Sequence, residues 1–296
     1  MPSTLDWNKD GANWPHRNTS RFVTAAGFKW HVQIMGTGPT LLLLHGTGAA
    51  THSWRGMMNG LAEHFTVISP DLPGHGFTDT PGASQMSLPG MSRAVGQLLR
   101  KLDATPEIAV GHSAGAAILV RMCLDDIIAP RMLISFNGAM LPLANMPNEL
   151  FAPLAKLMVA IPLVSHIAAR QAGSPKALDR LLRGTGSTID AEGVALYARI
   201  VGSPGHVAGA LAMMANWSLR TLARDLRRLT VPLTLVTGSG DRTIPPIDAA
   251  RIATMLPSSR LISMPGLGHL AHEEKPARAV DIVLEAARVA EASCVI

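Results

Sequence analysis

The chain has 296 residues, of which 47% are hydrophobic and 16% charged, and this composition excludes a disordered protein. Its formal net charge is +5, but the arginines are scattered, so no nucleic-acid-binding surface is expected. The start of the chain lacks the basic and apolar regions of a signal peptide, and the apolar runs are too short to span a bilayer. With only two cysteines, Cys123 and Cys294, no disulfide framework is expected, and we predict a cytoplasmic protein.

Short apolar runs that end in glycine, proline or polar residues predict the strands. They cover residues 21–25, 29–36, 40–46, 65–71, 107–113, 131–138, 232–241 and 260–266. The first two flank "AAGF" and predict an antiparallel hairpin. "TLLLLHG" is continuously apolar, as in a strand that is buried on both faces. Stretches with helical spacing, such as 91–104 and 114–126, separate most of the runs and predict a mostly parallel sheet with helices on both faces.

One segment breaks this alternation. From about Met140 to Leu219 the chain has only helical stretches interrupted by proline and glycine, which predicts a helical lid at 140–219. The lid divides the α/β core into residues 1–139 and 220–296. We expect it to lie over the carboxyl edge of the sheet, where open parallel sheets bind ligands.

The sequence "VGHSAG", residues 110–115, places a Gly-x-Ser-x-Gly motif between a predicted strand and a helix. At such a turn a serine has a strained backbone, the two glycines avoid crowding, and helix amides face the site. Ser113 is therefore the candidate nucleophile. A chance occurrence of the motif in a glycine-rich chain is the alternative.

A serine hydroxyl needs a base and a group that orients the base, in the order Ser, acid, His for this architecture. The ends of later runs supply Asp241 and His269, whereas the sixth run ends in Asn137, which is not an acid. We predict that His272 begins the last helix or faces solvent. A zinc site would need a third ligand, and none is apparent, so neither a metal nor another cofactor is expected.

The glycine-rich segment "HGTGAATHSW", residues 45–54, follows the third run. A tetrahedral intermediate needs amide donors that point at its oxyanion. We predict that the amides of Thr47 and Ala114 form this oxyanion hole, with Gly48 as an alternative donor. An ordinary tight turn is the competing interpretation.

Other titratable residues in these segments are interpreted as structural. His45 and His112 lie at strand ends, and Asp71 precedes Ser113, against the expected order. Cys123 falls in a helical run and is expected to be a buried small residue.

The predicted lid is unusually apolar, because "FAPLAKLMVAIPLV", residues 151–164, contains one charge. Flexible methionines suit a large flat apolar ligand, although packing of the lid on the body or contact with a membrane surface would also use such residues. The residues expected to bind substrate are Gly48, Trp54, Met140, Met213, Met214, Trp217 and Ile244.

The motifs "LLLLHGTGAATHSW", "VISPDLPGHGFT", "VGHSAGAA", "TGSGDRTIPP" and "GLGHLAHEEKP" together resemble the α/β-hydrolase superfamily. "DWNKDGANWPHRNTSRFV", "NGAMLPL" and "SPGHVAGALAMMANW" resemble one branch, the accessory α/β-hydrolases encoded with magnesium chelatase in bacteriochlorophyll biosynthesis. This resemblance implies an α/β-hydrolase fold, a tetrapyrrole-related or other apolar ester as ligand, and magnesium chelatase as a candidate partner. Relatives that cleave haloalkanes or epoxides use an aspartate nucleophile. Ser113 at that position argues against both reactions for this chain.

Two classes of function follow. The first is a serine hydrolase that cleaves carboxylic esters through an acyl-enzyme, with general carboxylesterase and carbon–carbon bond hydrolase as variants. The second is a porphyrin-binding or chelatase-assisting protein that retains the site without using it.

Overall fold

The computed structural model describes residues 5–142 and 174–292. Its strands form one eight-stranded sheet in the order β1-β2-β4-β3-β5-β6-β7-β8. The strands are β1 (Ser20–Ala25), β2 (Phe28–Met35), β3 (Thr40–Leu44), β4 (Thr66–Pro70), β5 (Ile108–His112), β6 (Met132–Phe136), β7 (Leu233–Gly238) and β8 (Arg260–Met264). The strands β1 and β2 form the predicted antiparallel hairpin, and β3 to β8 pair in parallel. The prediction of a mostly parallel sheet is therefore confirmed.

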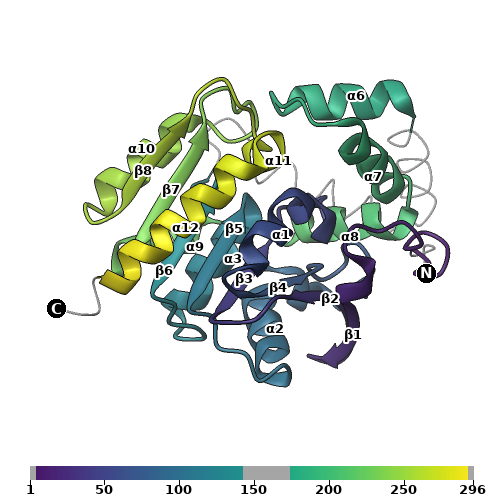
Figure 1. Cartoon of the computed structure of the whole chain (residues 1–296), viewed down its shortest axis with the longest axis horizontal. Helices are drawn as coiled ribbons and strands as arrows, with labels where there is room; N and C mark the ends of the chain where they lie inside the picture. Colours follow the sequence, from purple (N-terminus) through teal and green to yellow (C-terminus); the bar gives the residue numbers. More distant parts are fainter. Residues whose placement is uncertain (1–4, 143–173, 293–296) are drawn as a thin grey trace.

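The helices follow the strands in alternation, except in the segment between β6 and β7. They are α1 (Arg55–Ala62), α2 (Leu88–Lys101), α3 (Ala114–Leu124), α6 (Pro175–Gly184), α7 (Ala191–Val201), α8 (Pro204–Ala215), α9 (Arg220–Asp225), α10 (Pro246–Met255), α11 (Ala271–Glu274) and α12 (Pro276–Ala292). Figure 1 shows α6 and α7 on the opposite side of the view from α10 and β8. None of the helices in the described ranges is long and apolar enough to cross a bilayer.

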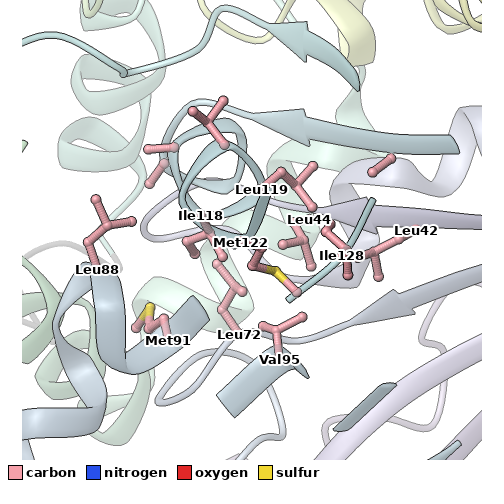
Figure 2. Close-up of a cluster of buried hydrophobic side chains, with 14 of the residues drawn as sticks. Leu42, Leu44, Leu72, Leu88, Met91, Val95, Ile118, Leu119, Met122 and Ile128 are labelled. Carbon is pink, nitrogen blue, oxygen red and sulfur yellow. The ribbon is translucent and has the colours of Figure 1, made fainter. Parts of the chain in front are cut away.

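The run of four leucines in β3 shows why the sheet has two covered faces. Leu42 and Leu44 pack in a cluster with α2 and α3, whereas Leu41 and Leu43 pack with α1 and α12. Successive side chains of a strand point to opposite faces, so each face receives two leucines. Figure 2 shows the first cluster, in which β3 lies against α3. All four leucines are fully buried, so both faces of the sheet are closed to solvent at β3.

Within the predicted lid, polar side chains set the starts of the helices. The Ser174, Asp190 and Ser203 side chains each accept a hydrogen bond from an amide in the first turn of α6, α7 and α8. Such caps satisfy amides that have no partner inside the helix. The apolar segment 151–164 lies outside the described residues. The lid boundaries 140–219 stay a prediction.

Candidate functional site

Ser113 lies between the end of β5 and the start of α3, in a strained backbone conformation. Its φ of 51° and ψ of −117° are unusual for a residue with a side chain. Neighbouring backbone holds this conformation, because the Ser113 amide donates to the Phe136 carbonyl at 3.1 Å and its carbonyl accepts from Ala139 at 3.0 Å. A Cβ at Gly111 would lie 2.4 Å from the Ala116 nitrogen, and one at Gly115 would lie 2.1 Å from the Leu44 oxygen. The motif therefore requires both glycines for close packing.

Asp241 and His269 are joined by a buried hydrogen bond. The His269 Nδ1 and Asp241 Oδ2 atoms are 2.8 Å apart, and the aspartate side chain is completely buried. The amides of Thr243 and Ile244 donate to Asp241 Oδ1 at 2.7 and 2.9 Å. Asn137 Nδ2 donates to Asp241 Oδ2 at 2.8 Å. This network fixes the carboxylate and leaves the far nitrogen of the imidazole available.

The loop that carries His269 lies beside the candidate nucleophile. His112, the residue before Ser113, bonds through Nε2 to the His269 carbonyl at 2.9 Å, and the two rings are 4.7 Å apart. The segment before α7 holds the same loop, since the His269 amide donates to the Thr185 carbonyl at 3.1 Å and the Leu270 amide to Ser187 Oγ at 2.8 Å. In the described part of the chain, no hydrogen bond joins Ser113 Oγ to His269 Nε2.

The turn after β3, residues 46–49, lies against Ser113 and is called the oxyanion turn below. The Ala49 amide donates to the Gly46 carbonyl at 3.2 Å, and Gly48 has φ +78°, as a type II turn requires at its third residue. A Cβ at Gly46 would lie 2.9 Å from the Ser113 Cβ. Within the described ranges, the amides of Thr47 and Ala114 donate to no protein oxygen. Among the described residues, neither predicted donor of the oxyanion hole is therefore occupied by a protein acceptor.

The helix α8 covers this turn. Thr47 Oγ1 lies 3.4 Å from Met213 Sδ, and His206 Nε2 lies 3.2 Å from the Gly48 carbonyl oxygen. The other ring nitrogen of His206, Nδ1, accepts from the Gly76 amide at 3.0 Å. Burial lowers the pKa of His206 to about 4, so this ring is neutral. Of the residues expected to bind substrate, Gly48 therefore belongs to the turn and Met213 contacts it.

The other residues expected to bind substrate divide into two groups. Met140 and Ile244 line a cavity of about 10 Å³ next to Asn137, and Trp217 is partly buried against the core. Trp54 is completely buried in the cluster of α1 and α12. Met214, on α8, is 47% exposed. For all of these residues, substrate contact stays a prediction.

His272 also differs from its predicted position. It belongs to the short helix α11, but it is completely buried rather than facing solvent. Its ring lies 4.5 Å from the His112 ring and 4.7 Å from the Trp54 ring. Burial lowers the pKa of His272 to about 3, which indicates a neutral core residue.

The residues interpreted as structural are all buried. His45 accepts from the Leu72 amide at 2.9 Å, and Asp71 bonds to His31 at 2.7 Å and to the amides of Thr51 and Phe77. Cys123 is 9% exposed, and burial raises its pKa to about 12. Across residues 5–142 and 174–292, no three His, Cys, Asp or Glu side chains are grouped so that they could hold a metal ion.

A buried carboxylate joins the helical segment between β6 and β7, called the insertion below, to the α/β core, called the body. Glu273 contacts Arg55 Nη1 at 2.7 Å and accepts from the Tyr197 hydroxyl at 2.7 Å. Burial raises the pKa of Glu273 to about 7, although the charge of Arg55 and the bond from Tyr197 act in the opposite direction. Arg55 also pairs with Asp190 at 2.6 Å, and the cluster therefore connects α1, α7 and α11.

Sequence reasoning missed two residues of this site. Asn137 was set aside because it cannot serve as the acid. Its role as a donor to Asp241 depends on the direction of its side chain, which the sequence does not show. His206 lies in the apolar stretch "SPGHVAGALAMMANW", and its isolation among apolar residues is the sequence feature that could have identified it.

Comparison with known proteins gives consistent results. The family model described as "alpha/beta hydrolase fold" matches residues 39–276. The "Magnesium-chelatase 30 kDa subunit" of Rhodobacter capsulatus is 38% identical over 264 residues, which cover 88% of this chain and 92% of that protein. A "Soluble epoxide hydrolase" of Corynebacterium sp. is 25% identical over 284 residues, which cover 88% of this chain and 93% of that protein. The crystal structure of an α/β-hydrolase fold protein from Burkholderia ambifaria superposes with a TM-score of 0.77 at 23% identity, covering 96% of this chain and all of that one.

Proposed function

Because this chain belongs to the α/β-hydrolase family, we propose that it is a serine-dependent hydrolase that cleaves carboxylic esters through an acyl-enzyme. The observation that carries the proposal is the strained Ser113 at the end of β5, with the bonded pair of Asp241 and His269 held beside it. Three separate strand ends bring these side chains to one edge of the sheet. That edge is where open parallel sheets bind ligands.

In the proposed mechanism, Ser113 Oγ attacks the ester carbonyl while His269 Nε2 takes the hydroxyl proton. Asp241 holds the His269 ring in the tautomer that leaves Nε2 unprotonated and stabilises the imidazolium that forms. The amides of Thr47 and Ala114 stabilise the oxyanion. His269 then gives the proton to the leaving alcohol, and a water molecule hydrolyses the acyl-enzyme to the acid. The hydrogen bond between Ser113 and His269 would tighten when substrate binds, as such bonds often do.

The proposed ligand is a large apolar ester, of which a tetrapyrrole ester is the favoured example. Met213 contacts Thr47, and Met140 and Ile244 line a cavity next to Asn137, which bonds to Asp241, so apolar side chains lie near both parts of the site. The name of the Rhodobacter capsulatus relative connects that protein with magnesium chelatase. The residues proposed to contact the ligand are Gly48, Met140, Met213, Trp217 and Ile244.

A panel of substrates tests this proposal. Purified protein is assayed with p-nitrophenyl esters of increasing chain length, with porphyrin methyl esters, and with a carbon–carbon hydrolase substrate. We expect ester turnover that Ser113→Ala lowers by at least about a thousandfold. Porphyrin affinity, measured by fluorescence quenching, should change little in that variant, because the hydroxyl acts mainly in the transition state. Turnover that survives Ser113→Ala would overturn the proposal.

The Rhodobacter capsulatus relative favours a second candidate, a chelatase-assisting protein that does not use its serine. The same variant separates the two. Under this alternative, the wild-type protein binds porphyrin and hydrolyses no ester, and Ser113→Ala supports magnesium insertion as well as the wild type in a chelatase assay.

A further inference from the structure

The helix α8 is fixed to the body at a point where two backbones touch. A Cβ on Gly209 of α8 would lie 1.8 Å from the Gly74 carbonyl oxygen, and one on Gly74 would lie 2.9 Å from the Gly209 Cα. Contact this close leaves no room for either residue to carry a side chain. The position of α8 relative to the loop after β4 is therefore defined closely.

From that position α8 contacts two loops through the side chain of His206. His206 Nδ1 accepts from the Gly76 amide, so Nε2 carries the proton and donates to the Gly48 carbonyl at 3.2 Å. The ring is buried, and His75 and His45 next to it are also buried and neutral because burial lowers their pKa. One tautomer of one side chain thus connects a fixed loop to the turn that carries Thr47.

The contact with Gly48 constrains the orientation of the turn. The Gly48 carbonyl belongs to the peptide that follows the turn's third residue, and the Ala49 amide of the same peptide closes the turn onto Gly46. Rotation of this peptide would break both bonds and move the Thr47 amide. A donor of an oxyanion hole must be aimed at the oxyanion before the reaction begins.

We propose that His206, although it belongs to the insertion, is a positioning residue for the oxyanion turn, an inference that rests on the proposed hydrolase function. His206 touches no reacting atom in this role. It acts through the Gly48 carbonyl, and its loss is expected to affect the transition state more than the bound substrate.

The test compares three substitutions in the full-length protein with a p-nitrophenyl ester as substrate. His206→Ala should lower kcat by about tenfold to a hundredfold and change KM by less than about threefold. His206→Gln, whose amide can reach Gly48, should recover most of the kcat. His206→Asn, whose shorter side chain can accept from Gly76 but cannot reach Gly48, should behave like His206→Ala.

A tetrahedral inhibitor gives a second readout. Phenylboronic acid forms a bond from Ser113 Oγ to boron and imitates the tetrahedral intermediate, and its affinity should fall in parallel with kcat. Val95→Ala, a cavity-forming change in α2 far from the turn in sequence, controls for lost stability and should leave kcat and inhibitor affinity unchanged.

The outcomes separate this inference from the proposed function. If Ser113→Ala abolishes turnover but His206→Ala leaves kcat and boronate affinity at wild-type values, the inference is wrong and the hydrolase remains. Equal kcat in the Asn and Gln variants would also contradict it. If Ser113→Ala retains turnover, the proposed function itself fails.

Discussion

At the scale of single residues, Asp241 shows how much of a site follows from sequence. Its place after a buried run identified it as the candidate acid, because the carboxyl ends of parallel strands meet at one edge. Of the four donors that surround it in the structure, His269 was predicted, whereas the two amides and Asn137 were not predictable in the same way. They depend on loop conformation and on rotamers, which the order of residues does not specify.

The two histidines of "GLGHLAHEEKP" provide a prediction at this scale. His269→Ala should lower ester turnover per folded molecule by several orders of magnitude, because the base is lost. It should also lower the unfolding free energy, because the buried Asp241 carboxylate loses a hydrogen-bond partner. His272→Ala should lower only the unfolding free energy, by about 1–3 kcal/mol, because it leaves a cavity beside Trp54. Turnover per folded molecule should stay near wild type.

Urea titration and steady-state kinetics measure the two quantities for each variant. If His272→Ala removed activity from a fully folded protein while His269→Ala did not, the assignment of the base would be reversed.

At the scale of elements, the strands were predictable and the packing of the insertion was not. Continuous apolar runs such as "TLLLLHG" are typical of a strand covered on both faces, and the two clusters around β3 confirm that prediction. The helix α8 is apolar on more than one side, so its sequence does not show which side faces the body. Met213 and Met214 are adjacent on α8, yet one is buried over the turn and the other is exposed.

The backbone contact between α8 and the loop after β4 gives the second prediction. Gly209→Ala should lower the unfolding free energy by at least about 2 kcal/mol, because the new methyl group would overlap the Gly74 carbonyl. Gly184→Ala is the matched control in α6. Nothing lies within 4 Å of a Cβ at Gly184, so its stability should be unchanged or rise by up to about 1 kcal/mol. Chemical denaturation of both variants measures the difference, and equal effects would show that α8 can shift at no cost.

At the scale of the whole molecule, the insertion and the body are joined through Glu273. Its folded pKa of about 7 lies above the ordinary value of 4.5, so its protonated form favours the folded state. That contribution is fully present below about pH 4.5 and is lost as the pH rises through 7. We expect Glu273→Gln to remove this loss, which amounts to at most about 3 kcal/mol, because glutamine stays neutral and can still bond to Tyr197 and Arg55.

Urea unfolding at pH 5 and pH 8 measures the effect in wild type and variant. Glu63→Gln, which neutralises an exposed glutamate, controls for the change in net charge. Wild type and Glu63→Gln should lose stability between the two pH values by a larger amount than Glu273→Gln. An identical loss in all three proteins would mean that Glu273 is ionised throughout.

The conformation of Ser113 also limits how far this protein can be stabilised by substitution. A position with φ of 51° favours glycine, whereas the proposed chemistry needs a hydroxyl there. Selection for folding and selection for turnover would then act in opposite directions on the same codon. A library screened only for heat resistance would be expected to enrich inactive Ser113→Gly proteins, and any thermostable variant that keeps its serine must gain its stability elsewhere in the chain.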